Sequence, residues 1–182
     1  MKVSKWASRF IGAAIIQGAL ATLITLYIVV GQIFFLRPEP SRVIAFGSAG
    51  MWFTMGYLTY LIVGVMGVAV TALFYNYIES VLEKPYSGLA EKLAWVHLIL
   101  MNVGVVGATW LMMLGGYLGG AAMLPPEVGG RGWNPGQVHT NIFYGIPLGY
   151  PLWITIFILI LAAGAISGGL GFIMRWRSKQ PQ

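Results

Sequence analysis

Four long apolar runs, separated by short polar connections, account for most of the chain. They cover residues 10–36, 50–78, 93–120 and 148–174. A helix needs about 20 apolar residues to cross the hydrocarbon core of a bilayer, and each run is at least that long. The pattern therefore predicts an all-α fold, an integral membrane four-helix bundle, in which residues 1–182 form a single transmembrane domain.

The first run follows a basic N-terminal segment, as the apolar core of a secretory signal does. Such a core is only about 7 to 15 residues long and is followed by a small-residue cleavage site. The run here continues from Phe10 to Leu36. We interpret it as an uncleaved first membrane helix.

The connection between the third and fourth runs is the least regular part of the chain. Its sequence, LPPEVGGRGWNPGQVHTNIFYGIPLGYP, is dense in glycine, proline and aromatic residues. Clusters of this kind mark loops with defined turns. The sequence predicts a long Gly/Pro-rich structured loop at the membrane surface.

The distribution of basic residues predicts the orientation. If the chain crosses four times, its two ends and its second connection share one side of the membrane. That side carries Lys2, Lys5, Arg9, Lys84, Lys92, Arg175, Arg177 and Lys179, whereas the other carries Arg37, Arg42 and Arg131. Cytoplasmic segments retain an excess of Lys and Arg. Both termini are therefore predicted to be cytoplasmic, in a multi-pass protein of the cell membrane with the long loop outside.

Composition excludes an ordinary soluble domain. The chain is 58% hydrophobic and 9% charged, with a mean hydropathy of +0.77. Its net charge is +6, and the basic residues lie at the helix ends and in the tails, as expected from membrane orientation. The sequence therefore predicts no nucleic-acid partner, and it shows no sign of a soluble substrate. It has no cysteine, so no thiolate metal site or iron–sulfur cluster can form from this chain alone.

Small residues recur at four-residue spacing in the runs. In lipid, helices associate through small residues that permit close approach, because lipid tails are as apolar as the side chains. The pattern predicts helix packing, within this chain or against a partner. The residues concerned are Gly104, Ala108, Gly116, Gly120, Gly164 and Gly168.

His97 is the ionisable side chain of the third run and the candidate cofactor-binding residue. Ionisable groups inside a membrane are often functional, so we consider proton transfer or haem ligation. The alternative is a neutral histidine that hydrogen bonds to a neighbouring helix or a lipid headgroup. Asn102, placed more deeply, is predicted to hydrogen bond across helices.

His139 lies in the long loop with Glu127, Arg131 and Asn134. A closed zinc site needs four ligands and a catalytic one three, so the loop predicts no metal site. A haem held by both histidines is disfavoured because they lie on opposite sides of a core about 30 Å thick. Paired carboxylates, a nucleophile elbow and a phosphate loop are also absent, so no catalytic residue is assigned and no activity of its own is expected.

The third run resembles a known family. The segment HLILMNVGV followed by TWLMMLGGYLGGAAMLP is similar to the eleventh helix of haem-copper oxidase subunit I, and TYLIVGVMGVAVTALFYNYIE upstream resembles the tenth. The positions that fall on the eleventh-helix motif are His97, Met101, Gly104, Val105 and Gly116. The likeness extends over about the last three quarters of the chain, through the tenth to twelfth helices of that family.

The departures from the family pattern remove its cofactor ligands. Tyr57 and Thr59 stand near the two ligand histidines of the tenth helix, and Leu111 and Met113 replace the proline and second histidine of the eleventh. His97 falls on a position that is not a haem ligand in the family. The resemblance implies a degenerate relative without haem or copper.

These observations lead to one hypothesis and two alternatives. The hypothesis is a non-catalytic accessory subunit of a larger membrane complex, a respiratory haem-copper-type terminal oxidase, with membrane subunits and lipid as partners and no cofactor in this chain. One alternative is a redox-active membrane protein that binds a b-type haem or a quinone through His97. The other is an accessory subunit of another membrane enzyme, such as a copper monooxygenase.

Overall fold

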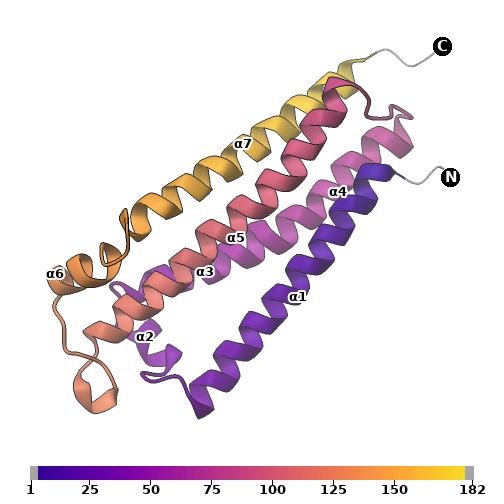
Figure 1. The fold of residues 1–182 in the computed structure, drawn as a ribbon. Coiled ribbons are helices and arrows are strands. Elements are labelled where there is room, and N and C mark those ends of the chain that lie inside the picture. The colour runs from indigo at the N-terminus through magenta and orange to yellow at the C-terminus, as the bar shows by residue number, and fades with distance from the viewer. Residues whose placement is uncertain (1–3, 179–182) are drawn as a thin grey trace. The chain divides into compact units, whose positions relative to one another are not determined.

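The computed structural model describes residues 4–178, and this part of the chain is helical without any strand. Four helices are long and apolar enough to cross a membrane, as the sequence predicts (Figure 1). Their bounds are α1 Lys5–Phe34, a composite second span Gly50–Val81, α5 Leu89–Met123 and α7 Gly149–Arg177. The all-α class and the four apolar helices are confirmed.

The second span is not one regular α-helix. Two π-helical segments, η1 Tyr60–Gly67 and η2 Tyr77–Val81, interrupt it. η1 separates α3 Gly50–Thr59 from α4 Val68–Asn76, and η2 ends the span. Because a π-turn contains an extra residue, each segment rotates the side chains that follow it. Apolar composition alone does not reveal such turns.

The chain divides into two compact units. The first contains residues 4–18, 62–106 and 157–178, and the second contains residues 19–61 and 107–156. The described basic residues of the first unit are Lys5, Arg9, Lys84, Lys92, Arg175 and Arg177, and those of the second are Arg37, Arg42 and Arg131. Lys2 and Lys179, which the orientation argument also uses, lie outside the described residues.

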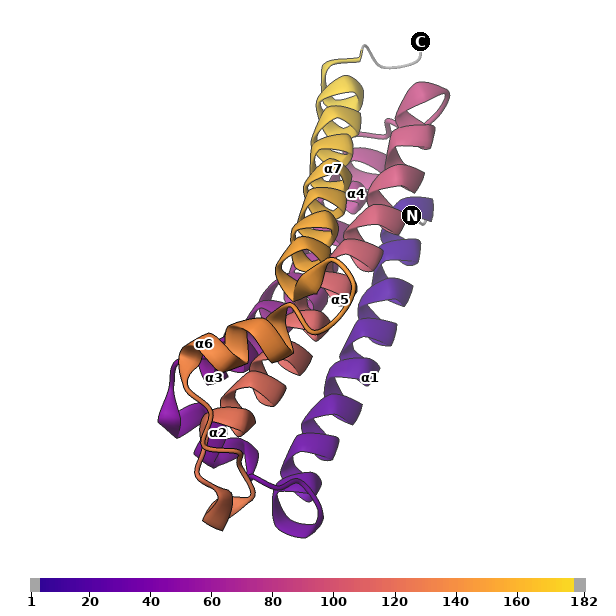
Figure 2. The ribbon, with the colours of Figure 1, turned by 60° about the vertical axis from the view of Figure 1, so that its left-hand side comes forward.

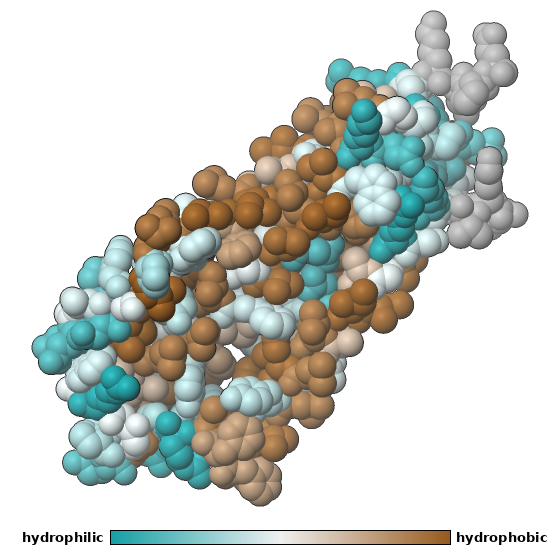
Figure 3. All heavy atoms as spheres, viewed as in Figure 1, coloured by the Kyte–Doolittle hydropathy of each residue, from teal (hydrophilic) through white to brown (hydrophobic). Residues whose placement is uncertain are grey.

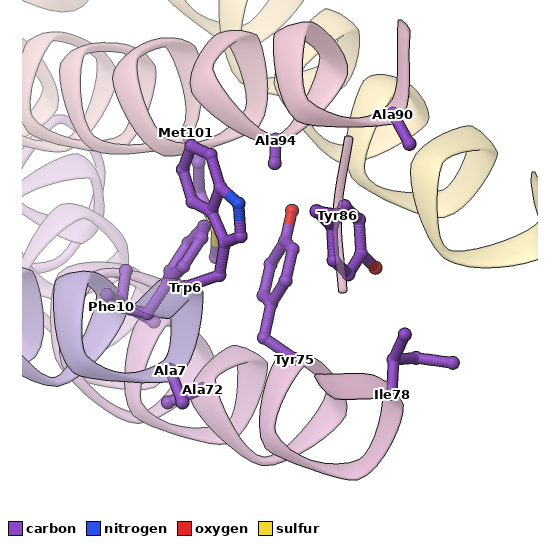
Figure 4. Packing of buried hydrophobic residues seen from close by; sticks show 11 residues of the cluster. Trp6, Ala7, Phe10, Ala72, Tyr75, Ile78, Tyr86, Ala90, Ala94 and Met101 are labelled. Carbon is purple, nitrogen blue, oxygen red and sulfur yellow. The ribbon is translucent and has the colours of Figure 1, made fainter. Parts of the chain in front are cut away.

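Aromatic rings form the core of the first unit (Figure 4). Phe10 stacks on Tyr75 with 4.8 Å between ring centroids, and Trp6 meets Trp95 edge to face at 5.3 Å. Ala72, Ala90 and Ala94 are nearly fully buried around these rings. The small alanines leave space for large rings, so the start of α1, the end of the second span and the start of α5 pack closely.

A single carboxylate holds the start of α1 in the first unit. Glu79 accepts hydrogen bonds from the Ser4 hydroxyl at 2.6 Å and from the Trp6 amide at 2.9 Å. The first amides of a helix have no partner within the helix. Glu79 supplies one, and its negative charge suits the positive end of the helix dipole.

The second unit contains the irregular connections. The long loop forms three short helical turns: η3 Pro126–Val128, α6 Pro135–Val138 and η4 His139–Phe143. Asn134 and Gln137 form a reciprocal capping box at the start of α6. Val138 then packs on Ala49 and Ala122, which places α6 against the end of α5 (Figure 2). Another short helix, α2 Pro40–Phe46, follows α1 and begins at a proline.

Large hydrophobic side chains are exposed along all four spans, and brown side chains cover much of the face that Figure 3 shows. Burial differs between helices: 39% of the most apolar stretch of α5 is buried, against 11% of that of α1. Of the four spans, the apolar stretch of α5 is the most buried and that of α1 the least buried.

Candidate functional site

His97 lies on α5 in the first unit and is only 8% exposed. Its Nδ1 atom is 3.1 Å from the hydroxyl of Tyr75, and the ring of Phe10 lies 5.0 Å from the imidazole centroid. The structure thus places the histidine in a buried aromatic cluster with one polar partner. That partner, Tyr75, is not distinguishable in the sequence from the other aromatic residues of its apolar run.

Gly168 on α7 makes this arrangement possible. A Cβ atom at this position would overlap Nδ1 of His97 and would lie 2.4 to 2.6 Å from two other atoms of its ring. The α7 backbone therefore lies directly against the imidazole. Only glycine leaves that space open. The sequence identifies Gly168 as a packing residue, but it does not indicate that a histidine is what packs on it.

The hydrogen-bond partners assign the tautomer of His97. The Tyr75 hydroxyl has His97 as its hydrogen-bond partner within residues 4–178, and a buried O–H that donates to nothing is costly. Tyr75 therefore donates to Nδ1. In the neutral imidazole the proton then resides on Nε2, which is left as a hydrogen-bond donor.

A cavity of about 320 Å³ adjoins His97. Its lining consists of aromatic, aliphatic, glycine and neutral polar residues from the first unit: Thr71, Phe74, Tyr75, Tyr86, His97, Gly168, Gly169, Phe172 and Ile173. The Thr71 hydroxyl donates to the Gly67 carbonyl at 2.8 Å. The cavity is therefore apolar and uncharged, with the imidazole and the tyrosines as its polar groups.

Tyr86, in the connection between the second span and α5, is 6% exposed and lies 4.9 Å from Tyr75 between ring centroids. Burial, reinforced by the negative charge of Glu79, raises the pKa of its hydroxyl above the usual value. The Tyr86 hydroxyl consequently stays protonated and neutral. Tyr86 therefore contributes a neutral side chain to the lining of the cavity.

Asn102 lies one to two turns beyond His97 on α5. Its side-chain oxygen accepts a hydrogen bond from Gln17 of α1 at 2.8 Å, and its amide nitrogen donates to the Leu98 carbonyl at 2.7 Å. This is the bond across helices that the sequence predicts. The side-chain oxygen and nitrogen of Asn102 both have partners, so this residue joins α1 to α5 and is not open to a ligand.

His139 lies apart from this cluster, in the second unit, and is exposed. Its ring packs on Tyr144 at 4.8 Å, while Arg131 lies over Trp133 and Asn134 caps α6. A small cavity of about 280 Å³ includes His139 in its lining. Within residues 4–178, no group of three or more His, Asp or Glu side chains could hold a metal ion.

The residues near the family's haem-ligand positions do not fit iron ligation. Tyr57 forms a 2.7 Å hydrogen bond with Thr25, and Thr59 ends α3. Met113, on α5, is buried. None of these positions presents an imidazole, so no haem-dependent step is assigned to this chain.

The small residues of α5 and α7 lie at contacts between helices of this chain. Cβ atoms at Gly104 and Gly164 would lie 2.5 Å from the Leu161 nitrogen and 2.7 Å from the Met101 nitrogen. In the second unit, Gly116 lies against the backbone of Phe53, and Gly120 against Val43 and Gly50. Ala108 is 3% exposed. At each of these glycines, neighbouring chain occupies the space of a side chain.

Comparison of the chain with protein families, with curated proteins and with solved structures finds no match.

Proposed function

We propose that this chain is a non-catalytic accessory subunit of a larger complex in the cell membrane. Its four apolar helices support a multi-pass membrane protein. The charge distribution favours a topology with both termini in the cytoplasm and the Gly/Pro-rich loop outside. The observation that carries the proposal is the uncovered side of α1.

This side contains a glycine that nothing contacts. No atom lies within 4 Å of the position that a Cβ of Gly12 would occupy. The side chains around it, Ile11, Ile15 and Ile16, are 51%, 67% and 63% exposed. α1 therefore presents a shallow notch flanked by large aliphatic groups, within the part of the helix that belongs to the first unit.

A small residue between large aliphatic ones suits close packing with a helix from another subunit. Helices in lipid gain little from covering apolar surface, and they associate where small residues permit backbone approach. Gly104 and Gly164 serve this purpose inside the chain, whereas the notch at Gly12 faces outward. We therefore place the contact with a partner helix at Gly12.

The resemblance of α5 to the eleventh helix of haem-copper oxidase subunit I supports a particular kind of complex. We propose a respiratory terminal oxidase of that type, with this chain bound beside its catalytic subunits. The chain itself contributes helix surface and lipid contacts in this proposal, and the redox centres belong to its partners.

Co-purification from native membranes tests the proposal. A C-terminally tagged chain, produced at its natural level, is extracted in mild detergent, and the bound membrane subunits are identified by mass spectrometry. We expect oxidase subunits to remain with the wild type and to be lost from Gly12→Leu. The matched control Gly169→Leu, also at a glycine with no atom within 4 Å of its Cβ position, retains them.

Crosslinking makes the test specific to the α1 surface. Since the chain lacks cysteine, an Ile15→Cys variant provides a unique thiol for crosslinking to the co-purified subunits. A crosslink to an oxidase subunit supports the proposed contact. A chain that purifies alone from native membranes, or equal retention of partners by Gly12→Leu and the wild type, contradicts the proposal.

A further inference from the structure

His97, which lines the cavity, has a hydrogen-bond donor without an acceptor. Tyr75 occupies Nδ1, and within residues 4–178 the Nε2–H group has no partner. The imidazole is 8% exposed and lies in the N-terminal part of α5. Nε2 is not one of the fully enclosed polar atoms that lack a partner within residues 4–178, so a ligand that supplies an acceptor oxygen can reach this donor.

The walls of the cavity suit a flat ring. Phe74 of α4 and Phe172 of α7 meet edge to face at 5.8 Å, and Tyr75 and Tyr86 add two more rings (Figure 4 shows the two tyrosines side by side). Aromatic side chains bind planar ligands by offset stacking and edge contacts. The Tyr75 and Thr71 hydroxyls already have partners, Nδ1 of His97 and the Gly67 carbonyl, so neither donates to a ligand.

Charge and size narrow the class of ligand. No Lys, Arg, Asp or Glu lines the cavity. No charged side chain of the lining would pair with a phospholipid headgroup, and an acyl chain would leave Nε2–H unpaired. A volume of about 320 Å³ is at the lower end of the range for small-molecule sites, about 300–1,000 Å³, which suits a one- or two-ring headgroup better than a haem.

We propose that this cavity binds the headgroup of a membrane quinone, with Nε2–H of His97 donating a hydrogen bond to one quinone carbonyl. The oxidised ring is neutral and planar, and its carbonyls accept hydrogen bonds without donating any. Tyr75 holds the imidazole of His97 in the tautomer that donates from Nε2. Gly168 lets the same imidazole pack directly against α7. The inference does not depend on the accessory role or on the partner of the complex.

The isoprenoid tail leaves the cavity beside Gly169. No atom lies within 4 Å of the position of a Cβ at this glycine. Phe74 and Ile173, which also line the cavity, are 56% and 45% exposed. This uncovered side gives an apolar tail a path to the lipid. It also provides a position at which a larger side chain can block the site without disturbing the fold.

Binding by the purified full chain in lipid nanodiscs tests the inference. The probes are a benzoquinone and a naphthoquinone, each with a single isoprenoid unit, and the readouts are calorimetric titration and quenching of tryptophan fluorescence. We expect saturable binding of at least one probe. His97→Phe should weaken it about tenfold, the effect of one lost hydrogen bond to the ligand. His97→Gln, which retains an N–H donor near the Nε2 position, should restore part of the affinity.

Gly169→Leu and Gly12→Leu form the matched pair. Gly169→Leu fills the exit and should abolish saturable binding, whereas Gly12→Leu on the uncovered side of α1 should bind as the wild type does. If His97→Phe does not fold, Gly169→Leu alone decides the test. Absence of saturable binding to the wild type, or unchanged binding by Gly169→Leu, overturns the inference. So does a co-purified phospholipid that neither quinone displaces. Loss of partners from Gly12→Leu with quinone binding intact would separate this site from the accessory contact.

Discussion

At the scale of single residues, His97 and Gly168 leave no room between them for one added methyl group. We expect Gly168→Ala to displace the imidazole or α7 and to lower the free energy of unfolding by about 1–3 kcal/mol, the usual cost of overpacking. Unfolding of the purified protein by SDS titration in mixed micelles measures this change. Gly169→Ala is the control, because its added Cβ meets no atom within 4 Å. Equal stability of the two variants would contradict the close packing of Gly168.

Glu79 gives a second prediction at this scale. Glu79→Gln removes the negative charge that accepts from Ser4 and from the Trp6 amide. We expect a loss of about 1–2 kcal/mol in unfolding free energy, since hydrogen bonds to charged groups are stronger than neutral ones. Hydrogen exchange of the Trp6 amide should also accelerate. The isosteric control Glu83→Gln changes an exposed carboxylate and should leave both measurements as they are.

The sequence identified the two ends of the His97 contact without joining them. His97 stands out because it is ionisable within an apolar run, and Gly168 because it belongs to a small-residue pattern. Tyr75 gives no comparable signal, since tyrosines and phenylalanines are common throughout the second run. Which residues face each other depends on the rotation of each helix, and the π-turns of the second span alter that rotation.

At the scale of helices, the contact between α5 and α7 depends on Gly104 and Gly164, each of which lies against the backbone of the other helix. A Cβ at Gly104 would lie 2.5 Å from the Leu161 nitrogen. We expect Gly104→Leu to force the helices apart and to lower the unfolding free energy by about 1–3 kcal/mol. The same SDS titration measures it. Gly12→Leu, which introduces the same side chain at an open position, should retain the stability of the wild type, and a similar loss in both variants would refute the argument.

The helix ends show where charged residues mislead a prediction from hydropathy. The sequence places the start of the third span at residue 93, but α5 begins at Leu89 and includes Glu91 and Lys92. Glu91 forms a 2.5 Å ion pair with Lys5, near the start of α1. A charge at a helix end therefore does not require a connection, because it can pair with another helix end. The short helices in the long loop depend on local capping, as at Asn134, which hydropathy does not report.

At the scale of the whole chain, the orientation in the membrane remains a prediction with a direct test. Because the native chain lacks cysteine, single thiols can be placed by Ser87→Cys between the second span and α5, and by Glu127→Cys in the long loop. A membrane-impermeant maleimide should label Glu127→Cys on intact cells. It should label Ser87→Cys only after permeabilisation. The reverse pattern would invert the predicted orientation.

The all-helical class and the number of spans follow from apolar runs that are long enough for a bilayer, so the sequence was sufficient for both. The division into two compact units was not foreseen, because all four spans contribute residues to both units. Hydropathy assigns a residue to a span but says nothing of its neighbours in other spans. The composition of each unit therefore emerges only from the contacts.

The Glu79 carboxylate also has a consequence for biosynthesis. The ribosome adds Glu79 to the chain 73 residues after Trp6, whose backbone amide donates to the Glu79 carboxylate. While the ribosome is still translating the second span, the N-terminal end of the first helix lacks its acceptor and must rely on water or lipid headgroups. The first helix can reach its final state only after the second has entered the bilayer, so the two are expected to mature as a pair during insertion.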